Sequence, residues 1–375
     1  MEVVLEHYKQ IDIIRQAERQ VETNFKIKPY DISHWNSGEE YKKLLLSALE
    51  LPPLSNLSDY CYSYSYSNKV KTRILSQHSF INAACTIFNS ATAAIATICC
   101  ALKEQGMKKV CIINPSYFSV SESFKTFNFD VTCINLEYEE TYHIPFKKIK
   151  EVDADVVWIT QPVFSTGTYL SNSELQELAK KASYLVCDAS MCDTINHLSD
   201  LRIDCKKAIF LFSPHKVISL NGVKFCYALC SYDIKNALED WGDIIGGSIT
   251  SSSALAVDHY LSDNYSKCRE LHTSYVERSH TTIDQIIKDN QEIIKKCGES
   301  EGTYETLSIL KVPFIEQVNL DFMYNLMSNT FVSITPGCAN GFDKQNGFCF
   351  RVNHTLNINE NTLALMHLIS YFRGL

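Results

Sequence analysis

The sequence lacks the long apolar and basic runs that mark membrane and nucleic-acid-binding proteins. No segment approaches the roughly eighteen uninterrupted apolar residues of a membrane span, and the N-terminus lacks the basic start and apolar stretch of a signal peptide. The 35 basic and 43 acidic residues give a net charge of −8 without a long basic tract. Internal repeats and low-complexity tracts are also missing. These absences argue against nucleic acid or a membrane as a partner and favour small-molecule chemistry.

The cysteine pattern excludes a disulfide framework. The fifteen cysteines are scattered, their count is odd, and the chain is far longer than a stapled secreted domain. We interpret them as reduced thiols and expect a cytoplasmic protein. With 375 residues, of which 45% are hydrophobic and 21% charged, the chain can bury a large core, which we expect to be divided between two lobes.

The first part of the chain is polar and predicted to be largely helical. One helix is predicted within residues 6–28 and a second over 39–50, which Pro52 and Pro53 end. The tyrosine- and serine-rich stretch 60–66 alternates with period two, but it is polar on both faces. It is therefore predicted to be a loop or an edge segment.

Short apolar runs then alternate with helical segments. Such alternation predicts the α/β class, with a mostly parallel, seven-stranded-type sheet and helices on both of its faces. The predicted strands are residues 110–115, 156–160, 184–188, 208–212 and 225–230.

The last third of the chain predicts a smaller α+β lobe. Residues 252–297 contain no proline and are expected to form one long or broken helix. Short strands over 308–312, 331–334 and 348–352 and a final helix over 359–372 follow. We expect an N-terminal segment (1–50) that contributes to the small domain and the site, a cofactor-binding large domain (51–250) and a small C-terminal domain (251–375).

Polar residues follow several of the predicted strands, where ligands of open α/β sheets bind. Asn89–Thr92 precedes an apolar helix and suits either a phosphate site or an ordinary helix cap. Tyr117 suits stacking on a flat ligand, or simple packing. Asp188 ends an apolar strand, where an acid either pairs with a cation such as a pyridinium N–H or caps the following turn.

Lys216 is the residue best suited to covalent chemistry. It follows the run 208–212, with Ser213 before it and a glycine turn and Lys224 behind it. A lysine in this setting suits imine formation with an aldehyde that carries a phosphate. The alternative for the lysine taken alone is a solvated loop cation.

Six segments, taken in chain order, resemble those of the pyridoxal-phosphate enzymes of fold type I, and more narrowly of the aminotransferase class I/II family. The resemblance runs from about Lys28 to the C-terminus and implies a large aminotransferase domain with a smaller α+β domain. The segments are Asn-Ser-Ala-Thr (89–92), Pro-Ser-Tyr (115–117), Pro-x-x-Ser-Thr-Gly (162–167), Leu-Val-x-Asp-Ala-Ser (185–190), Ser-Pro-His-Lys (213–216) and Phe-Arg-Val (350–352).

The resemblance implies pyridoxal 5′-phosphate as cofactor and an L-amino acid as substrate, and no metal site is expected. Lys216 would form the Schiff base and shuttle the α-proton, while Asp188 would keep the pyridine nitrogen protonated. Tyr117 would stack on the ring. The expected cofactor-binding set is Ser90, Ala91, Thr92, Tyr117, Asp188, Ser190, Ser213, Lys216 and Lys224.

The resemblance also implies a substrate site and a homodimer with shared active sites. Arg351 matches the arginine that grips the substrate carboxylate. In the N-terminal segment His34, together with Glu18, Glu22 and Asp59, is a source of side-chain contacts to the substrate. A tyrosine of 60–66 and Thr250 or Ser251 are expected to reach the partner's phosphate site. His34 and His215 add acid–base capacity, or are structural histidines.

The departures from the family pattern leave the reaction open. Phe164 replaces the asparagine that bonds the cofactor's phenolic oxygen, and Met191 replaces the tyrosine that donates to the same oxygen. This loss is expected to alter the pKa of the imine and the lifetime of quinonoid intermediates, unless Ser190, Gln161 or a water compensates. Lys224 stands where many members have arginine. The alternatives to transamination are elimination, cyclisation or oxidation of a guanidino amino acid, as in capreomycidine or enduracididine synthases, and a catalytically silent regulator.

Overall fold

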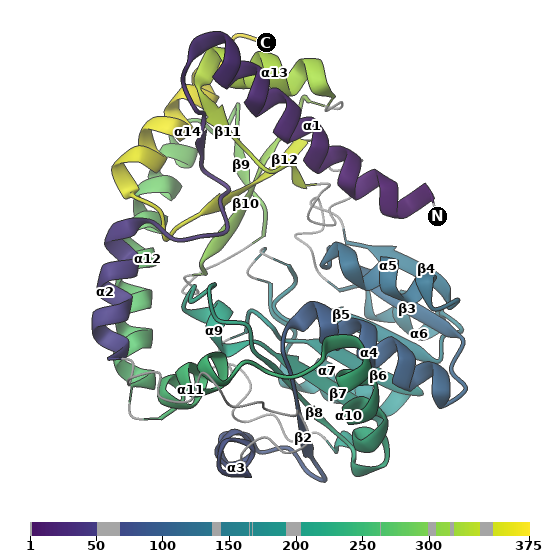
Figure 1. Cartoon of the computed structure of the whole chain (residues 1–375). Helices are drawn as coiled ribbons and strands as arrows, with labels where there is room; N and C mark the ends of the chain where they lie inside the picture. The colour runs from purple at the N-terminus through teal and green to yellow at the C-terminus, as the bar shows by residue number, and fades with distance from the viewer. Residues whose placement is uncertain are drawn as a thin grey trace.

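The computed structural model folds into two lobes, with the larger lobe below the smaller one in Figure 1. It describes residues 2–50, 68–136, 144–164, 166, 168–192, 204–262, 264–298, 305–315, 319–337 and 348–375, with side chains from Ile11 onward. None of the helices within these ranges is both long and apolar enough to cross a membrane. The predicted stretch 60–66 and Asp59 lie outside them.

A seven-stranded sheet forms the centre of the large lobe. Its strand order is β2-β8-β7-β6-β5-β3-β4, and only β8 runs antiparallel to its neighbours. The strands are β2 (Ala84–Phe88), β3 (Lys109–Asn114), β4 (Asp130–Asn135), β5 (Val156–Thr160), β6 (Tyr184–Asp188), β7 (Ala208–Phe212) and β8 (Cys226–Cys230). The predicted α/β fold with a mostly parallel sheet is therefore confirmed.

The prediction missed the two edge strands, β2 and β4. Because an edge strand pairs on one side only, its sequence need not be apolar throughout, and β4 is indeed partly or fully exposed along its length. This reason does not apply to β2, which is buried at every position. The inner strands β5, β6, β7 and β8 are buried at every position. That burial is why they read as continuous apolar runs.

Alternate side chains of these strands enter two separate cores. On one face they pack with α4 (Ala91–Glu104), α5 (Phe118–Thr126) and α10 (Tyr232–Gly246) around the fully buried Trp158. The other face is covered by α2 (Glu39–Leu49), α3 (Asn68–Ser76), α6 (Phe146–Glu151), α7 (Asn172–Lys181) and α11 (Ser251–Tyr260). Each large apolar side chain buried in this way contributes about 1.5–3 kcal/mol.

The small lobe has a core of its own. Its antiparallel sheet, in the order β12-β10-β9, comprises β12 (Phe348–Asn353), β10 (Leu307–Val312) and β9 (Lys295–Lys296), while β1 (Tyr30–Asp31) pairs in parallel with β11 (Val332–Ser333). Helices α1 (Glu2–Phe25), α13 (Leu320–Thr330) and α14 (Ile358–Arg373) cover these strands. The N-terminal residues thus share a core with the C-terminal ones.

Helix α12 (Tyr265–Lys288) joins the two lobes. Cys268 and Tyr275 belong to a core of the large lobe, whereas Ile283 and Ile287 belong to that of the small lobe. The helical stretch predicted over 252–297 is therefore broken between α11 and α12 and ends at Lys288. Figure 1 shows α12 running up the side of the molecule beside α2.

Candidate active site

The N-terminus of α4 lies at the carboxyl end of β2. The Ser90 hydroxyl accepts a hydrogen bond from the Ala93 N–H at 3.1 Å, which confirms the predicted helix cap. The backbone N–H groups of Ala91 and Thr92 belong to the first turn, where no carbonyl of the helix can accept from them. This end of the helix is therefore electrostatically suited to an anion.

The reversed strand β8 brings two further residues to the same place. Phe88 of β2 pairs with Cys226, and Phe212 of β7 pairs with Tyr227, so the start of β8 lies between the carboxyl ends of β2 and β7. Ser213 follows β7 and is buried beside the Cys226 thiol. Lys224 precedes β8 and is exposed, and its N–H donates to the Ser253 hydroxyl at 3.1 Å. The proposed phosphate ligands therefore converge from three strands.

Lys216 lies on the one-turn helix α9 (Pro214–Val217) and is partly buried. Burial lowers the pKa of its ammonium, and the nearby positive charge of Lys224 lowers it further, while Asp188 acts in the opposite direction. Two side chains outside the loop hold the backbone that follows the lysine. Arg269 donates to the Val217 carbonyl at 3.1 Å, and the Tyr41 hydroxyl donates to the Ile218 carbonyl at 2.6 Å.

His215 is a buried neighbour of this lysine. Burial and the positive charges of Lys216 and Lys224 lower the pKa of its imidazole to about 3. The ring is therefore neutral at physiological pH and does not act as a cation here. Its Nδ1 has no hydrogen-bond partner among the residues that the structure describes.

Asp188 ends β6 and is 5% exposed. Its Oδ1 accepts from the Ser190 N–H at 3.1 Å, and its carbonyl accepts from the Gln161 N–H at 2.9 Å. In the sheet register it stands opposite Thr160, the last residue of β5. A carboxylate at this depth requires a hydrogen-bonded or cationic partner.

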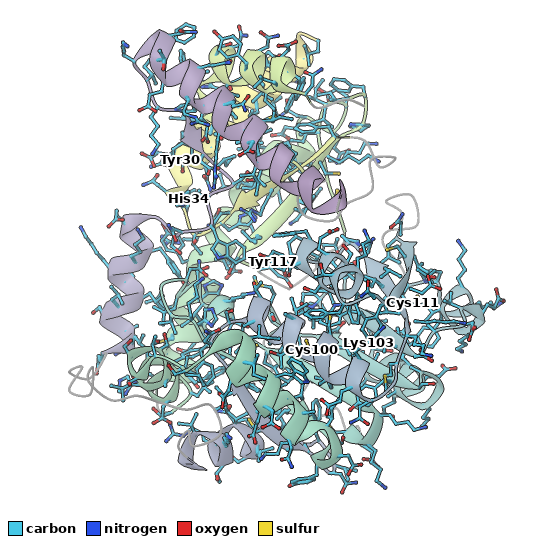
Figure 2. The ribbon with its side chains drawn as sticks, turned by 45° about the vertical axis from the view of Figure 1, so that its right-hand side comes forward. Tyr30, His34, Cys100, Lys103, Cys111 and Tyr117 are labelled. Carbon is cyan, nitrogen blue, oxygen red and sulfur yellow. The ribbon has the colours of Figure 1, made fainter. Side chains whose placement is uncertain are left out.

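Tyr117 precedes α5 at the carboxyl end of the β3 segment and is partly buried. Figure 2 shows it at the top of the large lobe, facing the small lobe. Its ring packs against Phe118 with centroids 4.6 Å apart. Tyr117 also lies close enough to Arg351 to influence the pKa of that guanidinium.

Arg351 projects from β12 of the small lobe towards the N-terminal segment. Its Nε and Nη2 both donate to the Ser33 carbonyl, at 3.0 and 2.6 Å, and its guanidinium lies 5.2 Å from the centre of the Trp35 ring. Burial lowers its pKa to about 10, while Asp31 and Tyr117 act in the opposite direction. The guanidinium therefore remains charged at neutral pH and is held in one orientation by the backbone.

His34 is exposed on the same segment, below Tyr30 in Figure 2. Its Nδ1 accepts from the Asn36 N–H at 3.1 Å. Of the acidic residues predicted beside it, Glu18 accepts from the Ser333 hydroxyl at 2.6 Å and Glu22 is exposed. The carboxylate of Glu18 is thus already used within the small lobe.

Gln161, one of the residues expected to compensate for the missing donors, is committed to the backbone. Its side-chain amide accepts from the Leu170 N–H and donates to the Leu170 carbonyl, both at 3.0 Å, and it is buried. Phe164 packs against the core of the large lobe, and Met191 is partly buried. Phe164 and Met191 carry no hydrogen-bond donor, and the Gln161 amide is held against the backbone of Leu170.

Some residues of this region escaped sequence reasoning. Tyr41 and Arg269 lie in helices distant in sequence, and nothing in the chain's pattern indicated that they hold the backbone after Lys216. Trp35 stood in a loop without a recognisable motif. Thr160 could have been found from the sequence, because it is a polar residue at the end of a predicted strand, as Asp188 is.

The buried polar atoms at this edge provide a test of whether the residues fit pyridoxal phosphate. The Thr160 and Ser190 hydroxyls and the His215 Nδ1 are buried without a hydrogen-bond partner among the described residues. Buried polar groups are normally paired, so an unpaired cluster indicates a missing ligand. An anion site, an acid and a lysine of lowered pKa surround this cluster, and the set fits the cofactor.

Comparisons with known proteins agree with this geometry. Residues 39–368 match the model of the family "Aminotransferase class I and II". The chain is 26% identical over 274 residues to histidinol-phosphate aminotransferase 2 of Archaeoglobus fulgidus, a match that covers 71% of each chain.

Solved structures share the fold. Aspartate aminotransferase from Thermus thermophilus, determined with maleate, superposes with a TM-score of 0.76 at 13% identity, covering 96% of both chains. A pyridoxal-phosphate-dependent aminotransferase from Streptococcus suis gives a TM-score of 0.75 at 17% identity, covering 92% of this chain and 93% of its own. The chain belongs to the aminotransferase class I and II family of pyridoxal-phosphate-dependent enzymes.

Proposed function

We propose that the chain transfers the amino group of an L-amino acid, with Lys216 as the residue that bonds to the cofactor aldehyde and moves the proton at the substrate α-carbon. Bound pyridoxal phosphate supplies the electron sink for the charge that develops at that carbon. The observation that carries the proposal is the lowered pKa of Lys216 beside Asp188. A lowered pKa raises the fraction of neutral amine, which is the form that acts as nucleophile and base.

The other residues have roles that follow from their positions. Ser90, Ala91, Thr92, Ser213 and Lys224 hold the phosphate, because they converge at the N-terminus of α4. Asp188 pairs with the ring nitrogen and thereby gains the cationic partner that its burial calls for. Tyr117 covers the ring.

Arg351 binds the substrate α-carboxylate from the small lobe. Its guanidinium is oriented by two hydrogen bonds to the Ser33 carbonyl and lies close to Tyr117. Such pre-orientation reduces the entropy lost when the substrate binds. His34 lies on the segment that orients Arg351, and its side chain contacts the side chain of the substrate.

Borohydride reduction followed by peptide mass analysis tests the role of Lys216. We expect the reduced cofactor on the peptide that contains Lys216, and no stable label in Lys216→Ala. Lys206→Ala is the matched control, because Lys206 is an exposed lysine on a different loop. A label on another lysine, or normal turnover by Lys216→Ala, would contradict the assignment.

A second candidate reaction is elimination, cyclisation or oxidation at the same α-carbon, as in enzymes that act on guanidino amino acids. The observation that favours it is that Phe164 and Met191 carry no hydrogen-bond donor, while the Gln161 amide is bonded to the Leu170 backbone. An amino-acid panel without any oxo acid separates the two. A stoichiometric shift to the pyridoxamine form supports amino-group transfer, whereas catalytic product release with retention of the pyridoxal form supports the second reaction.

We further propose a homodimer with shared sites in the cytoplasm. Thr92 and Lys224, at the phosphate end, are exposed in the single chain, as are Tyr232 and Ile244 of α10. Light scattering coupled to size exclusion is expected to give twice the chain mass of 42.7 kDa.

A reducing compartment predicts that all fifteen cysteines titrate as free thiols in denaturant without reductant, and a lower count of free thiols would contradict it.

A further inference from the structure

Two hydroxyl groups are buried near Asp188, those of Thr160 and Ser190. Thr160 is 6% exposed and Ser190 is 5% exposed, and neither hydroxyl has a hydrogen-bond partner among the described residues. Because both hydroxyls lie beside Asp188 at the carboxyl edge of the sheet, a group bound at the proposed site can pair with them.

The sheet places Thr160 on the ligand side. Side chains alternate along a strand, so Thr160 shares a face with Trp158, and Asp188 shares one with Val186. Trp158 and Val186 belong to the core that packs against α4 and α5. Helix α4 begins at the anion site, and α5 begins directly after Tyr117. Thr160 and Asp188 therefore stand together on the face and at the edge where the proposed site lies.

The strand order then determines which side of the cofactor ring faces Thr160. The phosphate arm and the ring hydroxyl of pyridoxal phosphate are on opposite sides of the axis that runs from the ring nitrogen to the aldehyde carbon. The phosphate ligands lie at the ends of β2 and β7, and Asp188 lies at the end of β6. A ring whose nitrogen is at Asp188 and whose phosphate is at β2 must direct its hydroxyl towards β5, which Thr160 ends.

From this arrangement we infer that Thr160 and Ser190 donate the hydrogen bonds to the ring hydroxyl oxygen of pyridoxal phosphate. The inference rests on the proposed function. It names the donors that replace the usual ones, whose positions are taken by Phe164 and Met191. The Gln161 amide is already held against the Leu170 backbone by two hydrogen bonds. Ser190 is held close to Asp188 by the bond from its N–H to Oδ1, at 3.1 Å.

A donor to this oxygen has a measurable electronic effect. It would withdraw electron density from the oxygen and so weaken the hold of that oxygen on the proton at Lys216 Nζ. The pH at which the visible absorbance of the bound cofactor changes is thereby lowered. Removing one donor is expected to raise this midpoint by about one pH unit, because a hydrogen bond to a charged group contributes about 1.5–3 kcal/mol.

The experiment is a pH titration of the visible absorbance of the holoenzyme, together with the Kd for added pyridoxal 5′-phosphate. The test variants are Thr160→Val and Ser190→Ala, and Thr160→Ser and Ser190→Thr keep the hydroxyl as rescue variants. Thr97→Val is the matched control, because Thr97 is a fully buried hydroxyl without a partner in the middle of α4.

An upward midpoint shift of about one unit in both test variants, with rescue and an unchanged control, supports the inference. A midpoint equal to that of the wild type in both test variants overturns it, and a shift in one variant alone overturns the role of the other residue. If the wild type binds no pyridoxal phosphate, the proposed function fails instead. That failure is distinguishable because no visible band then appears in any protein.

Discussion

Glu305 is a partly buried residue of the small lobe, and the titration of its carboxyl group should be visible in the stability of the whole chain. Burial raises its pKa from the ordinary value of 4.5 to about 7. Its Oε1 accepts a hydrogen bond from the Tyr169 hydroxyl at 3.0 Å. That bond and the positive charges of Arg269 and Lys296 act in the opposite direction without cancelling the effect of burial.

The sign of the effect on stability follows from where the proton is held. Between about pH 4.5 and pH 7 the folded chain keeps the Glu305 proton, whereas the unfolded chain has released it. The free energy of unfolding therefore decreases as the pH rises through this window. The contribution is complete below pH 4.5 and lost above pH 7. The difference of about 2.5 pH units between the pKa of Glu305 in the folded and unfolded chain corresponds to about 3 kcal/mol in the free energy of unfolding.

The perturbation that isolates this contribution is Glu305→Gln. Glutamine keeps an oxygen that accepts from Tyr169, but it does not ionise. We expect the variant and the wild type to be about equally stable at pH 5, and the variant to be more stable by about 2–3 kcal/mol at pH 8. Urea unfolding at several pH values measures the difference. Glu292→Gln is the control, because Glu292 is exposed and its pKa is lowered, so it should show no gain.

Parallel stability curves for the wild type and Glu305→Gln between pH 5 and pH 8 would refute this reasoning. Such a result would mean that Glu305 titrates in the folded chain as it does in the unfolded one. A gain of equal size in Glu292→Gln would also refute it, since the effect would then reflect net charge rather than burial.

The remaining predictions concern packing and capping. Gly298→Ala should lower the free energy of unfolding by about 3 kcal/mol or more, because its φ is +82° and a Cβ would lie 1.8 Å from the Thr166 carbonyl oxygen. Gly106→Ala, at φ +83° with nothing within 4 Å, should cost only about 1 kcal/mol, and equal losses in urea unfolding would contradict the steric reasoning. Ser171→Ala removes the capping box of α7 and should cost about 1 kcal/mol in the same assay, whereas an unchanged stability would show that the cap is dispensable. Tyr41→Phe leaves a buried backbone carbonyl and a histidine nitrogen without their bonds of 2.6 Å and should cost about 1–3 kcal/mol by urea unfolding; no loss would mean that these groups find other partners.

Local sequence was sufficient for the elements that carry the site. The inner strands β5 and β6 are buried on both faces, so they had to be apolar along most of their length, and they end in the polar residues Thr160 and Asp188. The edge strand β4 was not predicted, because one side of it needs no burial. Helix α12 was predicted as part of a longer helical stretch, because apolar periodicity indicates that a segment is helical but does not show where one helix ends and the next begins.

The site itself was predictable only as a set of residue types. Lys216, Asp188 and Ser90 each follow a strand, and their order along the chain matches the family. Whether the phosphate ligands meet in space depends on the register of β8. This strand runs antiparallel to both of its neighbours and so brings Lys224 to the end of β2. A one-residue shift of that strand would reverse the face on which each of its side chains lies.

The amino-acid sequence by itself determined the α/β class and the family, because hydrophobic periodicity and motif order are properties of the chain alone, and it is the source of the prediction for Lys216. Tertiary structure alone decided which polar groups remain available for a ligand. The Gln161 amide is bonded to the Leu170 backbone, whereas the hydroxyls of Thr160 and Ser190 are buried without a partner among the residues that the structure describes. Hydrogen bonds are made between residues that only folding brings together, so no local pattern records which of them are already satisfied.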